Sequence, residues 1–211
     1  MIEHLMAAVA GAELDDLTVT LDGPEPPILD GDVLSYLHLI EEAGLKPQPA
    51  PRTALKIRRE VRVADGGAHA ALSPAPSLTY DFLLEYDTPA IGRQHYSFAF
   101  SSAAFRELIA PARTFGFLKD LEALNRMNLA RGASLDNTLA LDESGVVNTD
   151  RQRFADEFVR HKILDAVGDM ALAGHPLIGR FEGVRSGHGL NNRLLRALFA
   201  DPGNYELVTL P

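Results

Sequence analysis

The segment RHKILDAVGDM, residues 160–170, places three chemically active side chains at intervals of four residues. They are His161, Asp165 and Asp169. If the segment is helical, these side chains form one stripe, each about one turn from the next. An imidazole and a carboxylate on one helix face can bind a metal ion, but such pairs are common on helices without one. The stripe alone leaves two interpretations: a metal site, or aspartates that face water beside a histidine packed at an edge.

Two further stretches carry groups that suit hydrolysis. In IEHL, residues 2–5, Glu3 and His4 are adjacent, as in zinc hydrolases where a histidine binds metal and a neighbouring glutamate takes a proton from water. In SGHGLNN, residues 186–192, His188 lies between glycines that permit unusual backbone angles. Taken alone, the first stretch also fits a polar helix start and the second a turn before a helix.

A fourth stretch, PARTFGF at residues 111–117, has Arg113 and Thr114 within an apolar run, although a loop between helices would look the same. Together the four stretches supply the parts of metal-assisted hydrolysis. Two histidines and one aspartate leave an open position on a zinc ion. A free glutamate can act as base, another histidine as acid, and a threonine hydroxyl can donate to an oxyanion.

The composition of the 211-residue chain, with 46% apolar and 23% charged residues, is ordinary for a globular protein. A formal net charge of −9 disfavours broad binding to nucleic acid or anionic membranes. The chain has no cysteine, which excludes disulfides and cysteine-ligated metals. No run approaches the roughly 18 apolar residues of a membrane span, and the N-terminal stretch is acidic where a signal peptide is basic. We therefore expect a cytoplasmic protein that binds no nucleic acid and does not insert into membranes.

The periodicity of the apolar residues predicts an α+β fold, because helices and strands mix without regular βαβ order. Helices are expected at 2–11, 32–45, 102–112, 117–129, 151–174 and 190–201. Strands are expected at 17–21, within 55–66 and 68–89, and at 95–101, 138–142, 146–149 and 181–187. Three prolines make 46–53 the expected linker, since proline suits neither a helix interior nor a strand ladder.

Seven stretches resemble, in the same order, the motifs of the UDP-3-O-acyl-N-acetylglucosamine deacetylase family. They are IEHLMAAVAG, DGPEPPILDG, YDTPAIGRQ, APARTFGF, RGASLDNTLALD, DEFVRHKILDAVGDM and SGHGLNN, and they cover essentially the whole chain. The last two are highly specific, whereas EHL alone is not. The resemblance implies a zinc-dependent hydrolase that removes acetate from the 2-acetamido group of a UDP-sugar carrying a 3-hydroxyacyl chain. This reaction is the committed step of lipid A biosynthesis in Gram-negative-type bacteria.

By position, the resemblance makes His4, His161 and Asp165 the ligands of one catalytic zinc ion. It implies that these three side chains meet although one of them is far from the others in the sequence. Two imidazoles and one carboxylate also suit Fe²⁺, so the sequence does not distinguish between the two metals.

The same resemblance implies roles for five further residues. Glu3 matches the general base that activates water, and Thr114 matches the residue that stabilises the oxyanion. His188 matches the second catalytic histidine, expected to be protonated and to serve the leaving amine, and Asp169 matches the acid that keeps it charged. Lys162 matches a lysine that meets the polar part of the substrate.

The family holds the acyl chain of its substrate in an apolar passage built by an inserted β-α-β unit, which corresponds here to about 115–142. The residues at matching substrate-binding positions are Phe115, Phe117, Leu118, Leu121, Ala130, Ser134, Thr138 and Lys162. The alternative is that the leucines of this amphipathic segment are buried core.

The resemblance also implies a two-domain α/β sandwich in which each domain packs a sheet on helices. Residues 1–50 correspond to the C-terminal part of the first domain and 54–205 to the second. Family members have a substantial stretch before the EHL motif, so we expect an N-terminally truncated chain with an incomplete first domain. A monomer that acts on the UDP-linked acylated glucosamine is expected. The alternative is a truncated relative, weak or inactive in catalysis, that binds a ligand or partner.

Overall fold

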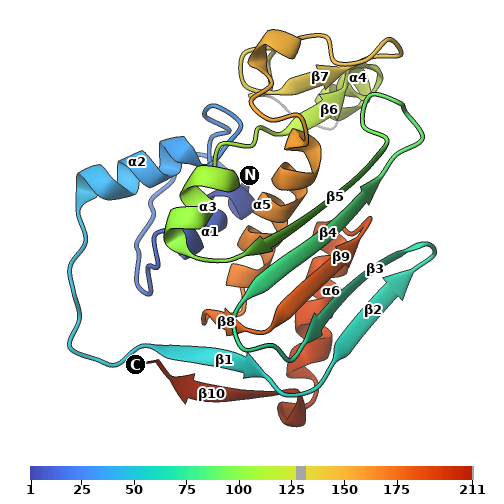
Figure 1. The fold of residues 1–211 in the computed structure, drawn as a ribbon. Helices are drawn as coiled ribbons and strands as arrows, with labels where there is room; N and C mark the ends of the chain where they lie inside the picture. The colour runs from blue at the N-terminus through green and yellow to red at the C-terminus, as the bar shows by residue number, and fades with distance from the viewer. Residues whose placement is uncertain (127–131, 211) are drawn as a thin grey trace.

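Helix α5 (Glu157–Ala171) lies at the centre of the molecule, between the main β-sheet on one side and helix α1 (Ile2–Gly11) on the other (Figure 1). Its side chains are buried along nearly the whole helix, and these include the polar residues His161, Asp165 and Asp169. The interpretation of the stripe as a solvated face is therefore wrong. The computed structural model that shows this describes residues 1–126 and 132–210.

The main sheet has five strands in the order β2-β3-β9-β4-β5. They are β2 (Val61–Asp65), β3 (Ala68–Ser73), β9 (Arg180–Val184), β4 (Thr79–Glu85) and β5 (Arg93–Ala99). Neighbours are antiparallel, except that β4 and β9 are parallel. Helix α5 packs on β4 and β5, and helix α6 (His188–Phe199) packs on β2 and β3. In β4 the alternate residues Tyr80, Phe82 and Leu84 are buried, and each fully buried Phe or Leu contributes about 1.5–3 kcal/mol.

Two smaller sheets flank this core. Strand β1 (Thr53–Ile57) pairs antiparallel with β10 (Tyr205–Thr209) and parallel with β8 (Leu177–Ile178). Strands β6 (Phe115–Phe117) and β7 (Leu139–Leu141) form a parallel pair, and helix α4 (Leu118–Arg126) follows β6 directly. The strands β6 and β7 and the helix α4 lie together at one end of the molecule, beyond the first residues of α5 (Figure 1).

The remaining elements are α2 (Leu34–Ala43), α3 (Ser102–Leu108) and the 3₁₀ turns η1 (Thr149–Arg151) and η2 (Pro202–Asn204). Helices α2 and α3 both contact α1, so α1 is held between them and α5. Helix α3 begins where the hydroxyl of Ser101 accepts a hydrogen bond from the N–H of Ala104 at 3.2 Å.

Helices packed on sheets confirm the predicted α+β class, and α1 spans the predicted residues. The strand expected at 17–21 is wrong. Leu17, Val19 and Leu21 are exposed, and this segment pairs with no strand in the described part of the chain, so its backbone has no ladder.

The helix expected from residue 151 begins instead at Glu157. The carboxylate of Glu157 accepts hydrogen bonds from the N–H groups of Arg153 and Phe154, which holds these preceding residues in a loop. Strand β10 was not predicted, because its partner β1 lies about 150 residues away along the chain.

The division into domains at 1–50 and 54–205 stays a prediction. None of the helices in residues 1–126 and 132–210 has the length and apolar character that a membrane span requires.

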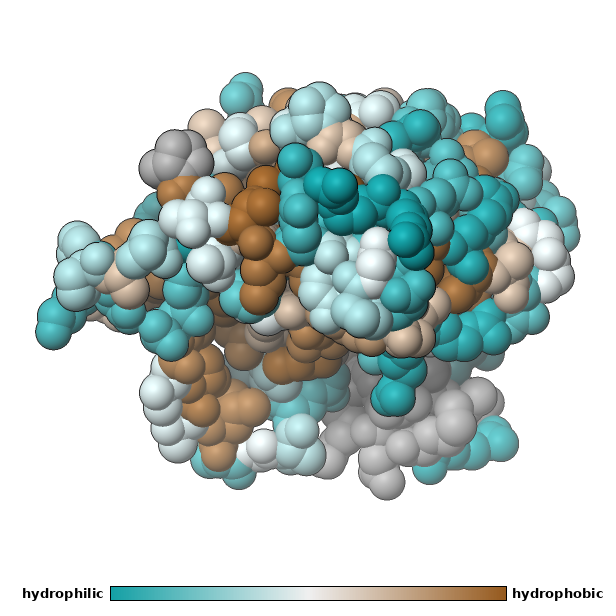
Figure 2. Space-filling model, turned by 90° about the horizontal axis from the view of Figure 1, so that it is seen from below, coloured by the Kyte–Doolittle hydropathy of each residue, from teal (hydrophilic) through white to brown (hydrophobic). Residues whose placement is uncertain are grey.

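On the face seen from below, apolar residues gather around a recess (Figure 2).

Candidate metal centre

Two imidazoles and one carboxylate from α1 and α5 meet in one space. The ligand atoms of His4, His161 and Asp165 all lie within 4.8 Å of one another, and all three residues are buried. Oδ1 of Asp165 lies 3.4 Å from Nε2 of His161 and 3.8 Å from Nε2 of His4. Neighbouring ligand atoms are about 3.3 Å apart around a tetrahedral zinc ion with bonds of about 2.0–2.1 Å. The arrangement therefore fits such an ion with small movements.

Contacts behind the ligands fix which atoms face this space. Nδ1 of His161 lies 3.0 Å from the carbonyl oxygen of Ala112, so this nitrogen carries the proton and Nε2 is free to bind metal. Nζ of Lys162 donates to Oδ2 of Asp165 at 2.6 Å, which leaves Oδ1 facing the imidazoles. Nδ1 of His4 is buried with no hydrogen-bond partner in the described residues, so packing orients this ring, edge-on to His161 with 5.1 Å between centroids.

Burial sets the charge of each ligand. It lowers the pKa of His4 to about 4, with a further contribution from the neighbouring His161. Burial also lowers the pKa of His161, although Asp165 acts in the opposite direction. Burial alone would raise the pKa of Asp165, but the Lys162 ammonium beside it lowers it. At neutral pH the three side chains are therefore two neutral imidazoles and a carboxylate, which are the forms that bind metal.

Helix α1 reaches this position because its backbone touches that of α5 at Gly168. A Cβ atom at Gly168 would lie 1.9 Å from the carbonyl oxygen of Glu3 and 2.9 Å from its Cα. Glycine in a helix interior costs about 1 kcal/mol of helix stability relative to alanine. The close approach of the two backbones explains why a glycine stands here despite that cost. Through this contact, Glu3 and His4 lie beside Asp165, which precedes Gly168 by three residues on α5.

His188, the first residue of α6, faces the same space. Its ring nitrogen and the carboxylates of Glu3 and Asp165 lie within 4.8 Å of one another. Nδ1 of His188 lies 3.0 Å from Oδ2 of Asp169, and Nδ2 of Asn191 donates to the same oxygen at 2.8 Å. The hydrogen bond with Asp169 raises the pKa of His188, against the effect of partial burial. The side chain is 51% exposed, so a proton on this ring can exchange with solvent or a ligand.

Thr114 lies in the segment that borders the centre. It follows Ala112 by two residues, and the carbonyl of Ala112 holds His161. The N–H of Thr114 donates to the carbonyl of Gly31 at 2.8 Å, and its own carbonyl accepts from the N–H of Leu139 at 2.8 Å. Its hydroxyl makes no hydrogen bond within the described chain, so it is free to donate to a ligand.

The predicted aromatic residues form part of a cluster beside the centre. The ring of Phe115 meets His161 edge-on at 6.2 Å between centroids and packs on Phe158 at 4.9 Å. Tyr86, which was not predicted, contacts Phe115 at 6.2 Å and Phe117 at 5.9 Å between centroids. Tyr86 therefore packs on β6 and lines the same cavity as Lys162, next to the centre.

The residues predicted to meet the acyl chain divide into three groups. Leu118 and Leu121 are 40% and 37% exposed, so the alternative that they are buried core is wrong. The hydroxyls of Ser134 and Thr138 form hydrogen bonds inside the turn that leads to β7. Ala130 lies outside the described residues.

A cavity of about 500 Å³ opens beside the centre and is lined by two cationic and two acidic side chains. It is lined by Leu84, Glu85, Tyr86, Asp87, Lys162, Arg185, Ser186 and Gly187. Lys162, which lines the cavity, donates to the ligand Asp165, and Gly187 directly precedes His188, so the cavity borders the candidate centre.

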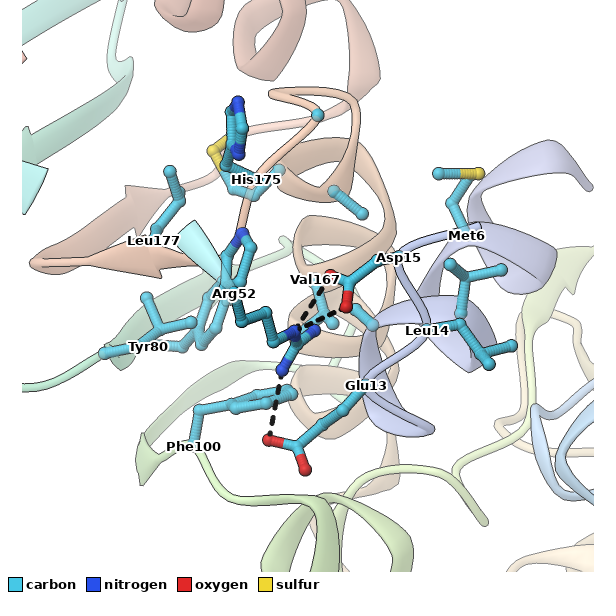
Figure 3. Close-up of a pocket in the computed structure, with 17 residues that line it drawn as sticks. Met6, Glu13, Leu14, Asp15, Arg52, Tyr80, Phe100, Val167, His175 and Leu177 are labelled. Atoms are coloured by element: carbon cyan, nitrogen blue, oxygen red, sulfur yellow. Dashed lines mark hydrogen bonds and ion pairs between the residues drawn. The ribbon is translucent and has the colours of Figure 1, made fainter. Parts of the chain in front are cut away.

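Another cavity, of about 180 Å³, lies away from these ligands (Figure 3). Met6 of α1 and Val167 of α5 line it, and the guanidinium of Arg52 at its edge binds Asp15 at 2.8 Å and Glu13 at 3.7 Å. Neither His4, His161 nor Asp165 lines this cavity, so we do not assign the chemistry to it.

Three parts of the centre were missed in the sequence: the carbonyl of Ala112, the helix contact at Gly168 and the ring of Tyr86. A backbone carbonyl leaves no signal in residue types. Gly168 did leave one, because a glycine inside a strongly predicted helix indicates close approach of another backbone.

Comparison with known proteins identifies the same family that the sequence motifs resemble. A family model described as UDP-3-O-acyl N-acetylglycosamine deacetylase matches residues 1–200. A protein of that activity, UDP-3-O-acyl-N-acetylglucosamine deacetylase from a Nitratiruptor species, is 48% identical over 207 residues, covering 98% of this chain and 70% of that protein.

Two more relatives carry the same name. The protein from Myxococcus xanthus is 47% identical, covering 98% of this chain and 66% of its own length. The protein from Acinetobacter baumannii (strain AYE) is 47% identical, covering 99% of this chain and 70% of its own length. The chain thus spans about two thirds of the length of these relatives.

The contact at Gly168 yields a first prediction. In Gly168→Ala the new Cβ forces α1 away from α5, so Glu3 and His4 move from Asp165. We expect the affinity for Zn²⁺, measured by competition with a chelating dye, to fall at least about 10-fold, because a ligand moves out of bonding range. The midpoint of thermal unfolding is expected to fall as well.

Gly189→Ala on α6 is the matched control, since among the described residues outside its own stretch of helix nothing lies within 4 Å of its added Cβ. This variant should bind Zn²⁺ like the parent and gain up to about 1 kcal/mol in the free energy of unfolding from helix propensity. Wild-type affinity in Gly168→Ala would show that α1 does not depend on this contact.

Proposed function

This chain belongs to the UDP-3-O-acyl N-acetylglycosamine deacetylase family, and on that premise we propose that it hydrolyses the 2-acetamido group of a UDP-3-O-acyl-N-acetylglucosamine. The products are acetate and the free 2-amino sugar, and the reaction serves lipid A biosynthesis. The observation that carries the proposal is the meeting of two imidazoles and a carboxylate with an adjacent glutamate and a third histidine that is paired with Asp169.

We propose that His4, His161 and Asp165 hold one zinc ion, with iron as the alternative metal that the same ligands accept. Bound there, the metal would supply Lewis acidity toward the acetamide oxygen and toward water. The neutral state of both imidazoles and the proton fixed on Nδ1 of His161 support this assignment.

The residues around the ligands supply the proton transfers. The Glu3 carboxylate accepts a proton from the water that attacks the acetamide carbonyl, since it lies within 4.8 Å of the ligand Asp165 and of His188. The free hydroxyl of Thr114 donates to the oxyanion that forms. His188, kept charged by Asp169, gives its proton to the departing amine, so the C–N bond breaks to a neutral amine.

The surroundings suit the two ends of the substrate. Lys162 and Arg185 line the cavity beside the centre together with Glu85 and Asp87, and of these the two cations suit the diphosphate of a UDP-sugar. The exposed Leu118 and Leu121 of α4 offer apolar surface for an acyl chain. Cytoplasmic location and a monomeric state stay predictions.

The decisive experiment measures metal content by mass spectrometry and acetate release from the acylated UDP-sugar on the same purified sample. We expect one zinc or iron per chain, loss of turnover on chelation and its return when the metal is added back. Glu3→Gln should keep the metal and lose about 10²–10⁴-fold in kcat, because a general base contributes that much. The exposed Glu42→Gln is the control and should match the parent. Unchanged turnover in metal-replete Glu3→Gln would refute the mechanism.

The pH dependence tests the role of His188. The hydrogen bond with Asp169 raises the pKa of His188 above its ordinary 6.5, so the acid form persists above that pH and is lost as pH rises through the raised pKa. The basic limb of kcat/KM should therefore lie above pH 6.5. Asp169→Asn removes the charge that raises this pKa and should move the basic limb to lower pH, with metal content retained. A limb that stays in place in Asp169→Asn would mean that another group is the acid.

A further inference from the structure

We propose that a cluster of arginines and carboxylates positions Thr114 at the metal centre by holding a loop, residues 28–32, against it. The cluster consists of Asp30, Asp32, Arg113, Arg153 and Glu157, none of which is itself a candidate ligand. The inference deepens the proposed function and rests on it for the role of the Thr114 hydroxyl. The placement of the loop follows from the contacts alone.

The loop and the arginines are joined by charged hydrogen bonds. Arg113 donates to both carboxylate oxygens of Asp30 at 2.8 Å and to the backbone carbonyl of Asp30 at 3.2 Å. Arg153 donates to Asp30 and to Asp32, so both arginines meet on the same loop. Such charged, multiply bonded pairs are stronger and more directional than neutral hydrogen bonds.

Much of this cluster is buried although it is charged. Asp32 is 1% exposed, Glu157 0% and Arg113 7%. Removing one partner of a buried pair leaves an uncompensated charge, which is strongly unfavourable. The cluster therefore fixes one arrangement of the loop.

Four consecutive residues, 111–114, are each held through a backbone group: two by the cluster residues Arg153 and Glu157, one by the loop and one by the ligand His161. The carbonyl of Pro111 accepts from Arg153 at 2.7 Å, and the carbonyl of Ala112 lies 3.0 Å from Nδ1 of His161. The N–H of Arg113 donates to Glu157 at 2.8 Å. The N–H of Thr114 donates to the carbonyl of Gly31, in the loop, at 2.8 Å. The segment is thereby tied to the loop, to a metal ligand and to the start of α5.

The loop is held on its other side too. Gly31 has φ +75, a conformation that favours glycine, and a Cβ there would lie 1.7 Å from the carbonyl oxygen of Asn137. Nδ2 of Asn137 donates to the carbonyl of Leu29 at 3.2 Å. The loop thus fills the space between Thr114 and the turn before β7, so a shift of the loop moves Thr114.

The test uses Asp30→Ala, because the Asp30 side chain is 41% exposed and Arg113 keeps its hydrogen bonds to the backbone carbonyls of Asp30 and Arg151, so the variant should stay folded. We expect kcat for acetate release to fall about 10- to 100-fold with metal content and KM within about 3-fold of the parent. Asp136→Ala is the matched control, since Asp136 also pairs with an arginine, Arg151 at 3.0 Å, but is 83% exposed and outside the cluster. It should behave like the parent.

A double-mutant cycle separates positioning from general destabilisation. In a Thr114→Ala background, Asp30→Ala should lower kcat by less than about 3-fold further, because the hydroxyl that Asp30 positions is already gone. Three outcomes would each overturn the proposal. The losses of kcat from Asp30→Ala and Thr114→Ala could multiply in the double variant, Asp30→Ala could lose its metal, or its kcat could stay unchanged.

Amide hydrogen exchange gives a readout that does not need activity. In Asp30→Ala the N–H of Thr114 should exchange at least about 10-fold faster relative to the buried amides of α5, and unchanged exchange would overturn the placement of the loop. If the metal-loaded parent shows no acetate release, the proposed function fails. Faster exchange in the variant would then still support the loop as the element that holds Thr114.

Discussion

The backbone contact between α1 and α5 at Gly168 is the constraint on which the candidate centre depends. Only a residue without a side chain lets the carbonyl of Glu3 come this near to α5. The approach brings His4 from α1 to the two ligands that α5 already carries. It also places Glu3, the proposed base, within reach of His188 on α6. One missing Cβ therefore determines how the groups on α1 lie relative to those on α5.

The position of α5 between the sheet and α1 explains the electrostatics of the centre. A buried helix that carries two aspartates and a histidine needs a partner for each charge. Lys162 pairs with Asp165, and His188 together with Asn191 satisfies Asp169. The imidazoles of His4 and His161 avoid the cost of burial by staying neutral, as the lowered pKa of each shows. The same burial that forms the core thus prepares the ligands in their metal-binding state.

The centre combines a segment fixed by hydrogen bonds with surface that stays open to solvent. Residues 111–114 are tied by backbone hydrogen bonds to several elements, so the side near Thr114 is held firmly. Leu118 and Leu121 of α4 stay exposed, and the cavity at Lys162 and Arg185 opens beside His188. A site that transfers protons needs fixed distances between the reacting groups, whereas a site that receives a long amphipathic substrate needs open surface. The chain supplies both within one fold.

The sequence by itself determined the residue types of the centre, the helical stripe of α5, the class of fold and the family resemblance, because each depends on local spacing or on the order of motifs along the chain. It misjudged 17–21, where alternation suggested a strand but no partner strand pairs with it in the described chain. It also missed β10 and the carbonyl of Ala112. Only the tertiary structure decided that the stripe is buried, that Glu3 and His4 lie beside Asp165, and that residues 28–32 hold Thr114. These are contacts between segments far apart in the chain, and sequence periodicity carries no information about which distant backbones touch.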